Sequence, residues 1–386
     1  MSSTTQSRAV LATGAVSRLV GERGNETFRK CMQCGTCSAL CPWTDIPGHP
    51  FNIRRLIQQV AFGDEGFEHD DILYACTTCR LCESMCPRGV ELVDFVRTMR
   101  QLVTQTGFYP NAYREVIYSL RTFGNPWSQK RENRLSWKKD LRIPTYKKGT
   151  DYLLFGCCTN AFDPDRQRSL YAFARLLQQA GVSFGILGKE ETCCGESIRK
   201  IGAQEDFTAL AQHNTDIFLE KGVETIITLS PHCHHIFKTA YPDLAAQVKI
   251  IHYTEMLETL LADGRLTPRE QPPINVSYHD PCYLGRHTGI YDAPRNIIHH
   301  IQGVQLVELR KNKKYSQCCG GGGGRIWMGG DSGKLANVRV RDAMDKEAET
   351  LLTACPYCTS MLDYSATVLG GQIRVMDLAE YVATCV

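Results

Sequence analysis

The sequence lacks the features of several common protein classes. No apolar run approaches 18 residues, so we expect no membrane-spanning helix. The formal net charge is only +3, which is too small an excess to indicate nucleic-acid binding. No Gly-x-Gly-x-x-Gly motif follows a predicted strand, so we expect no dinucleotide or flavin site on this chain. Residues 1–20 have no continuous apolar core, so we expect no signal peptide.

Cysteine, in contrast, is abundant. The 386 residues include 19 cysteines, and a chain of this length predicts two or three domains with enough residues to bury a core. In the absence of a secretion signal, so many cysteines indicate metal ligation rather than disulfides. The composition therefore predicts a metal-binding protein of the reducing cytoplasm.

Two cysteine runs with identical spacing lie in the first hundred residues. Each reads Cys-x2-Cys-x2-Cys-x3-Cys-Pro, the spacing typical of bacterial ferredoxins. In such runs three thiolates bind one [4Fe–4S] cubane, and the fourth cysteine reaches the other cubane. A pair of zinc knuckles is the alternative, but it explains neither the third cysteine nor the proline. We predict one cluster on Cys31, Cys34, Cys37 and Cys86, and a second on Cys76, Cys79, Cys82 and Cys41.

Helical patterns surround these runs. Apolar residues recur at helical spacing in residues 51–60 and again in 90–103, so residues 1–100 are predicted to form a helical ferredoxin-type domain. Residues 101–150 contain no cysteine, and their second half is rich in Lys and Arg with two interleaved tryptophans. We interpret 101–150 as a solvated basic linker that straps the two halves of the chain together, or as a docking segment for an acidic partner, with nucleic-acid contact as the alternative.

The rest of the chain is a duplication. Four cysteines and the residues around 224–228 recur at a constant offset of 125 residues. The paired cysteines are Cys157 and Cys282, Cys193 and Cys318, Cys194 and Cys319, and Cys233 and Cys358. Each copy alternates strands with helices, which indicates a parallel sheet whose site lies beyond the carboxyl ends of the strands. Strands are predicted at 152–155, 182–187, 225–229, 275–278 and 304–309. The copies are predicted to span residues 151–272 and 273–386.

The second copy contains five regularly spaced cysteines. Cys282 precedes Cys318 by 36 residues, and Cys319 precedes Cys355 by 36 residues, so the thiols would converge from separate loops. Five thiolates exceed the four ligands of a structural zinc site. The glycine run 320–324 could offer backbone N–H groups to a negatively charged, sulfur-rich cluster. A flexible linker beside inert cysteines is the alternative.

This pattern resembles the cysteine-rich CCG domain of the heterodisulfide reductase family. The residues that carry the resemblance are His279–His287, read as HDPCYLGRH, and the segment from Cys318 to Trp327. The resemblance implies a non-cubane iron–sulfur cluster, and a possible catalytic site, on Cys282, Cys318, Cys319, Cys355 and Cys358.

The first copy departs from this pattern. Ser230 stands where the second copy has Cys355, and Cys158 stands where it has Tyr283. Four thiolates suit an ordinary cubane, and we predict one on Cys157, Cys193, Cys194 and Cys233. Replacement of the missing ligand by Cys158 and loss of the metal are the alternatives. Histidines beside the cysteines could donate a proton, bond to cluster sulfur or simply pack; they are His232, His234, His235, His279 and His287.

From about Cys31 to its end, the chain resembles the fused, D-type subunit of heterodisulfide reductase. The implied fold is α+α/β, with a helical ferredoxin-type domain followed by two tandem α/β CCG domains. The implied function is that of an iron–sulfur electron-transfer subunit in the redox complex of an anaerobe. The expected partners are other subunits, including one with flavin and iron–sulfur groups, in the cytoplasm or held at the inner membrane through those partners.

Three other functions remain open at this point. One is a catalytic disulfide reductase subunit, which would use the complete second site. Another is the iron–sulfur subunit of a glycolate- or glycerol-3-phosphate-type oxidase. The third is a subunit of an anaerobic acyl-CoA complex of the benzoyl-CoA reductase type.

Overall fold

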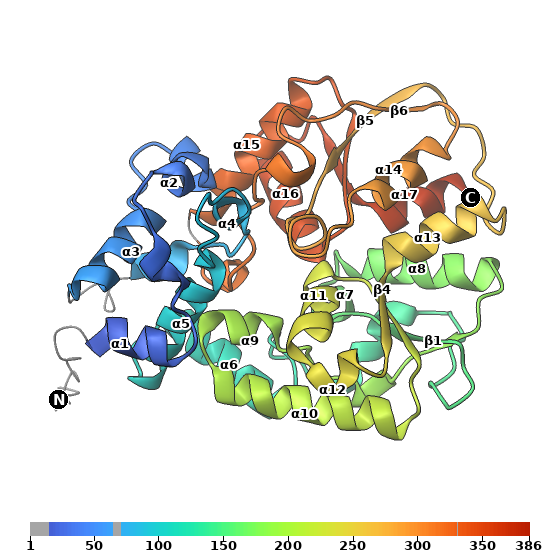
Figure 1. Ribbon diagram of the computed structural model, residues 1–386. Helices are drawn as coiled ribbons and strands as arrows, with labels where there is room; N and C mark the ends of the chain where they lie inside the picture. The colour runs from blue at the N-terminus through green and yellow to red at the C-terminus, as the bar shows by residue number, and fades with distance from the viewer. Residues whose placement is uncertain (1–14, 65–70, 330) are drawn as a thin grey trace, which may run out of the picture.

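Two parallel sheets form the centre of the structure. The computed structural model describes residues 15–64, 71–329 and 331–386 (Figure 1). The first sheet has the order β2-β1-β3-β4, and the second has the order β6-β5-β7-β8. Their bounds are β1 Tyr152–Phe155, β2 Phe184–Gly185, β3 Thr225–Thr228, β4 Lys249–His252, β5 Ile274–His279, β6 Val304–Leu306, β7 Thr350–Thr353 and β8 Arg374–Asp377. The expected α+α/β class is confirmed.

The central strands β1 and β3 are brief apolar runs buried along most of their length. Leu153, Leu154 and Ile227 are completely buried, as expected for parallel strands covered by helices. The strands expected at 182–187 and 304–309 are shorter than predicted, and β4, β7 and β8 were not among the predicted strands. Of these three, β4 and β8 are edge strands, so they receive less of the burial that makes a strand recognisable in sequence.

The two sheet units pack through equivalent helices. In the first unit these are α8 (Gln167–Gln179) and α13 (Tyr253–Ala262), and in the second they are α14 (Asp292–His299) and α17 (Leu378–Cys385). An offset of 125 residues relates the start of α8 to that of α14, and the start of α13 to that of α17. Because α8 packs on α17 and α13 packs on α14, the interface repeats the same contact twice. The duplicated units therefore associate much like the subunits of a twofold dimer.

Other helices flank the sheets. In the first unit they are α7 (Cys158–Phe162), α9 (Glu196–Ile201), α10 (Gln204–Glu220), α11 (Pro231–Ala240) and α12 (Pro242–Ala245). In the second they are α15 (Ser332–Met344) and α16 (Pro356–Val368). Helices α11 and α16 follow the central strands β3 and β7, and each begins with proline at its first position, where no intrahelical N–H bond is lost.

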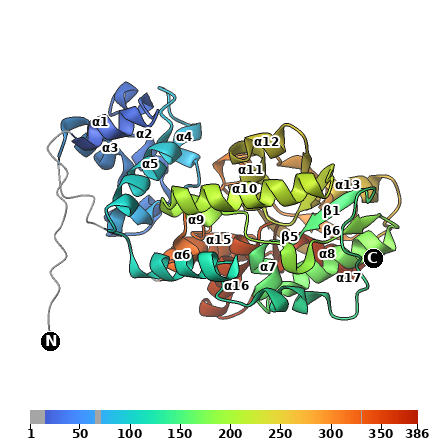
Figure 2. The same ribbon diagram turned by 90° about the horizontal axis from the view of Figure 1, so that it is seen from below.

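The N-terminal helices form a lobe beside the two sheets (Figures 1 and 2). Helix α3 is capped by the Asn52 side chain, which accepts from the N–H groups of Arg54 and Arg55, and it ends at Gly63. The lobe contains α1 (Ala15–Glu22), α2 (Thr36–Leu40), α3 (Ile53–Phe62), α4 (Leu81–Ser84) and α5 (Leu92–Gln105). The expectation of no signal peptide in residues 1–20 falls mostly on residues 1–14, which lie outside the described residues. Among the described helices, none combines the length and apolarity needed to cross a bilayer.

The basic segment 101–150 is partly buried in the fold and partly exposed. It contains the end of α5, helix α6 (Asn111–Phe123) and the 3-10 helix η5 (Arg131–Lys138). Arg134 and Trp137 are buried, and Trp127 packs edge-on against Trp327 of the second sheet unit. Of the eight Lys and Arg residues between 130 and 148, six are exposed, Lys138 is partly buried and Arg134 is buried, so the expected solvation fails at Arg134. Through its buried aromatic residues the segment contacts other parts of the chain, as expected of a linker that joins the two halves.

One buried arginine joins all three parts of the chain. Arg100 on α5 is fully buried, and its guanidinium donates to four backbone carbonyls. These belong to Leu73 and Cys76 in the lobe, Lys200 in the first sheet unit and Gly323 in the second. Buried carbonyls need donors, so Arg100 satisfies four groups that the close contact of these parts removes from water.

Replacing Arg100 should destabilise the whole assembly. Arg100→Met keeps much of the side-chain volume but leaves the four carbonyls without this donor, which should lower the free energy of unfolding by about 3 kcal/mol or more. The control is Arg97→Met on the same helix, which removes a partly exposed contact with Asp94 and should cost less than about 1 kcal/mol. Anaerobic thermal unfolding of the two variants at one heating rate makes the comparison. Equal midpoints would contradict a joining role for Arg100.

Candidate metal centre

The eight N-terminal cysteines gather around two cavities. One cavity is lined by Cys31, Cys34, Cys37 and Cys86. The other is lined by Cys41, Cys76, Cys79 and Cys82. Each cavity thus combines three cysteines of one run with the last cysteine of the other run. This is the grouping that ferredoxin spacing requires, while ligation itself stays a prediction.

The cysteines around the two cavities differ in exposure, and in both sets backbone N–H groups donate hydrogen bonds to sulfur. Cys34, on the first cavity, is exposed, whereas Cys79, on the second, is buried. Backbone N–H groups donate to the sulfurs of both sets, from Thr78 to Cys76 Sγ at 3.4 Å and from Val90 to Cys86 Sγ at 3.4 Å. Such N–H···S bonds stabilise thiolate sulfur and are one of the means by which proteins set cluster potentials.

Five of the six cysteines of the second sheet unit form a continuous row of thiols. Cys319 Sγ lies 3.2 Å from Cys358 Sγ. Cys319 also contacts Cys318, Cys318 contacts Cys282, and Cys358 contacts Cys355. All five thiols are buried, and the Gly320 N–H donates to Cys318 Sγ at 3.4 Å. The glycine run was expected to donate backbone N–H groups to sulfur, and Gly320 does so.

The remaining glycines of the run allow two parts of the chain to touch. A Cβ on Gly322 would lie 2.4 Å from the Thr77 carbonyl oxygen, and one on Gly323 would lie 2.4 Å from the Cys76 carbonyl oxygen. The run therefore lies directly on the cysteine loop of the N-terminal lobe, and the flexible-linker alternative is wrong. In the same interface Cys79 is in side-chain contact with Cys318.

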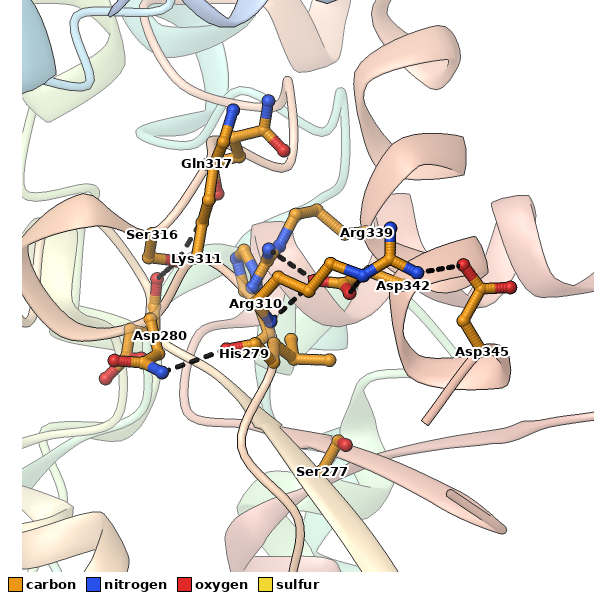
Figure 3. A network of polar contacts seen from close by, with 12 residues as sticks. Ser277, His279, Asp280, Arg310, Lys311, Ser316, Gln317, Arg339, Asp342 and Asp345 are labelled. Atoms are coloured by element: carbon orange, nitrogen blue, oxygen red, sulfur yellow. Dashed lines mark hydrogen bonds and ion pairs between the residues drawn. The ribbon is translucent and has the colours of Figure 1, made fainter. Parts of the chain in front are cut away.

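His279 lies beside the second row of thiols. A ligand atom of its ring lies within 4.8 Å of the sulfurs of Cys319 and Cys358. Figure 3 shows the surrounding polar network, in which Arg339 donates to His279 Nδ1 at 3.3 Å and also bonds to Asp342. Burial, followed by the charge of Arg339, lowers the pKa of His279 to about 3. The ring is therefore neutral, and because Nδ1 accepts from Arg339, its proton resides on Nε2.

His232 of the first sheet unit reaches the site of the second. Its ring contacts the Cys355 thiol, and its Nδ1 lies 3.2 Å from Glu196 Oε1. Burial opposes a charge on this ring, but Glu196 outweighs burial and raises the pKa of His232 to about 10. Burial also opposes a charge on Cys355 and so raises the pKa of its thiol. Hydrogen bonds from Cys358 and His232 outweigh burial and lower that pKa to about 5. An imidazolium thus faces a thiolate across the domain interface.

The other three histidines have different surroundings. His287 Nε2 lies 3.0 Å from the Thr78 carbonyl, and its ring stacks on Tyr283. His235 packs edge-on against both of these rings. His234 packs near His252, and burial lowers its pKa to about 4. Of the five histidines named from sequence, His232 and His279 are the two placed against site thiols by these contacts.

The first sheet unit gathers a similar set of thiols. Cys194 contacts both Cys193 and Cys233, and Cys233 contacts Cys157. Cys158 contacts Cys193, and the Arg134 guanidinium donates to Cys158 Sγ at 3.2 Å. Sequence reasoning missed Arg134 because it lies in a run of basic residues that resembled a solvated surface. Its partner Glu191, at 2.6 Å, gave no sequence signal either.

The donor sets fit iron–sulfur clusters. All 19 cysteines are free thiols, and seventeen of them, those predicted as ligands, fall into the four groups described above. The row of five thiols exceeds the four ligands that zinc takes, and the two N-terminal groups have the crossed grouping that a pair of [4Fe–4S] clusters requires.

Removing Cys86 should affect only the exposed cavity. Cys86→Ala takes one thiolate from the group containing Cys31, so that group should lose its cluster, and the iron content should fall by about four atoms per chain. The cluster predicted on the Cys76 run should keep its electron paramagnetic resonance signal. Cys41→Ala is the matched variant and should have the opposite effect. Loss of the same cluster in both variants would refute the crossed grouping.

A methyl group on Gly322 should separate the lobe from the second sheet unit. Gly322→Ala places a Cβ against the Thr77 carbonyl, so the contact must open or shift. We expect weaker magnetic coupling between the clusters of the two parts in the fully reduced protein, and a lower unfolding temperature. Gly333→Ala is the control, because its Cβ would meet Tyr364 at an ordinary distance of 3.5 Å. Unchanged coupling in Gly322→Ala would show that the contact is not needed.

Comparison with known proteins places these sites in a family. A family model described as a cysteine-rich domain, CCG, matches residues 152–238 and 276–363, and a 4Fe-4S dicluster domain model matches residues 27–90. A hypothetical protein from Helicobacter pylori has a similar fold, with a TM-score of 0.54 and 12% identity over 96% of this chain and 76% of that one. At that identity the likeness shows the fold alone.

Curated relatives include both longer proteins and one of similar length. The probable iron-sulfur-binding oxidoreductase FadF of Bacillus subtilis is 36% identical over 82% of this chain and 47% of its own length. The EtfAB:quinone oxidoreductase of Syntrophomonas wolfei is 34% identical over 80% of this chain and 46% of its own. The chain thus spans about half the length of these two relatives. The D-type subunit of the dihydromethanophenazine:CoB–CoM heterodisulfide reductase of Methanosarcina barkeri is 29% identical over 92% of both chains. The chain belongs to the family of iron–sulfur oxidoreductase subunits that join a 4Fe-4S dicluster domain to two CCG domains, the family of the D-type subunit of heterodisulfide reductase.

Proposed function

We propose that this chain is an electron-transfer subunit that connects a surface ferredoxin-type site to the buried CCG sites. The observation that carries this proposal is the contact between Cys79 and Cys318. Cys79 is a predicted ligand of the second ferredoxin-type cluster, and Cys318 belongs to the second CCG site. Iron–sulfur clusters would supply one-electron transfer at these sites, and two sites whose ligands touch are close enough to exchange electrons.

The proposed occupants follow the four thiol groups. The two N-terminal groups would each hold a [4Fe–4S] cubane, and the second CCG site would hold a non-cubane cluster. The first CCG site would hold a further [4Fe–4S] cluster. The residues proposed as ligands are Cys31, Cys34, Cys37, Cys86, Cys76, Cys79, Cys82, Cys41, Cys157, Cys193, Cys194, Cys233, Cys282, Cys318, Cys319, Cys355 and Cys358.

Exposure supports an inward route for electrons. Cys34 is exposed, and the cavity beside it is bordered by Arg54 and Arg88. A redox partner could therefore approach the first group closely. The second group lies between it and the CCG sites, where every cysteine is buried. The first group would exchange electrons with a partner, and the second group would relay them.

The burial of the CCG thiols favours electron transfer over direct disulfide reduction by this chain alone. Cys282 is 7% exposed, and the other four cysteines of its site are less exposed. A disulfide substrate would have to displace packed side chains to reach them. Catalysis at this site would therefore require an opening supplied by another subunit.

The partner proposed is a flavin- and iron–sulfur-containing redox subunit. The name of the Syntrophomonas wolfei relative combines EtfAB with a quinone, and the Methanosarcina barkeri relative is one subunit of a larger reductase. By analogy, this chain would work inside a redox complex, held near a membrane through its partners. Isolating the native complex without oxygen and identifying its subunits by mass spectrometry tests this directly. A purified chain that reduced a small disulfide as fast as the complex would overturn the assignment.

Interrupting the relay at Cys79 should isolate the CCG sites. In Cys79→Ala the predicted second cubane loses a ligand, while the exposed group keeps all four of its cysteines. We expect a low-potential protein donor to reduce the first cluster at the normal rate and the second CCG site at least about tenfold more slowly. Freeze-quenched samples followed by electron paramagnetic resonance give both rates. Cys385→Ala, which removes a thiol outside all four groups, should behave as the unchanged protein.

A further inference from the structure

The order of thiol contacts in the second CCG site gives a template for the first. The second row begins at Cys355, continues through Cys358, Cys319 and Cys318, and ends at Cys282. Each thiol touches the next, so the five form an open row with Cys355 and Cys282 at its ends. The middle three are related by the 125-residue offset to Cys233, Cys194 and Cys193.

The first site repeats this row with two different residues at the ends. Cys233 contacts Cys157 at one end, and Cys193 contacts Cys158 at the other. Cys157 therefore occupies the end that Cys355 occupies in the second site. Cys158 occupies the end that belongs to Cys282. The five-thiol row is complete, although its sequence pattern has lost one cysteine.

The backbone at Cys157 explains how neighbouring residues reach opposite ends. Cys157 has a φ of 68°, which is rare for a residue with a side chain, and it immediately precedes α7. This turn directs the two consecutive side chains to different sides. The second unit has no such turn at Cys282, and the next residue, Tyr283, instead bonds to Thr78 of the N-terminal lobe.

Ser230, which the 125-residue offset relates to Cys355, caps a helix. Its hydroxyl oxygen accepts from the backbone N–H of His232 at 3.3 Å and so caps α11. Cys355 makes no such capping bond, and its sulfur faces the row of thiols. The serine thus stabilises a helix end rather than extending the row.

A buried cation is placed against the new end of the row. Arg134 donates from Nη2 to Cys158 Sγ at 3.2 Å and from Nη1 to Glu191 at 2.6 Å. All three residues are buried, with exposures of 3%, 4% and 6% for Arg134, Cys158 and Glu191. A buried guanidinium that donates to a sulfur stabilises a charged thiolate there, as metal ligation requires.

We propose that Cys158 is the fifth cluster ligand of the first CCG site. With Cys157, Cys193, Cys194 and Cys233 it completes a five-thiolate set matching that of the second site. Five thiolates exceed the four ligands of a cubane, so both CCG sites hold the same kind of cluster. This inference rests on the cluster proposed above for the first site and specifies how it is bound.

Mössbauer spectra of ⁵⁷Fe-reconstituted chains test the ligand set. The variants are Cys158→Ser, which keeps a hydroxyl for Arg134, and Ser230→Ala, which removes the hydroxyl at the position that Cys355 has in the second unit. In Cys158→Ser we expect the signal shared by the two CCG sites to fall by about half, with the remainder lost or converted to another cluster type. Ser230→Ala and the control Cys385→Ala should give the spectrum of the unchanged chain. The two N-terminal clusters in the same molecules report whether the variant folds.

Three results would overturn the proposal. The first is an unchanged spectrum in Cys158→Ser, which would leave Cys158 outside the cluster. The second is loss of first-site iron in Ser230→Ala, which would make the serine the fifth ligand. The third is an unchanged chain without iron at the first site, which would also overturn the cluster proposed there. The first two results would leave the proposed electron-transfer function intact. Failure of the Cys158 proposal and failure of the proposed function can therefore be told apart.

Discussion

Close contact between the second cysteine loop of the lobe and the glycine run is the constraint on which the rest of the structure depends. Gly322 and Gly323 lie so near the carbonyls of Thr77 and Cys76 that no side chain fits between them. Such contact buries backbone polar groups, which are costly without partners. Arg100 supplies donors to carbonyls on each side of the contact, and so it makes the close approach stable.

The duplicated units use one interface for two purposes. The equivalent helix pairs hold the units together, and near the sites each unit inserts a side chain into the other. His232 of the first unit reaches Cys355 of the second. At the equivalent position 125 residues later, Tyr357 of the second unit bonds to Ser197 of the first at 2.9 Å. A symmetric scaffold thus presents a cation to one site and a phenol near the other, which is a chemical difference between otherwise similar sites.

The sequence predicted which cysteines lie together better than it predicted the residues that surround them. Ferredoxin spacing alone predicted which four cysteines would line each N-terminal cavity, because three closely spaced ligands restrict where the fourth can come from. The duplication was visible because a constant offset survives sequence change. The burial of Arg134 was not predictable, since a basic run is normally solvated and only the tertiary pairing with Glu191 and Cys158 compensates for the lost hydration. The sequence also did not show that Cys157 lies at the end of the row that Cys355 has in the second site, and Cys158 at the end that Cys282 has. This placement depends on one backbone turn at Cys157.

Under the proposed function, stability and electron transfer would depend on the same residues. In many proteins a functional site is placed on a rigid scaffold and can change independently of it. Here the lobe and the second sheet unit meet through the segments that carry Cys76, Cys79 and Cys318. A substitution that loosens this interface to gain flexibility would also increase the distance between the ligand groups. Conversely, tight packing there shields thiolate sulfur from water, which changes cluster potentials through the dielectric surroundings. In the proposed relay, the packing of this interface would be constrained by redox chemistry as well as by folding, and both constraints favour the close approach that the five glycines and the buried Arg100 make possible.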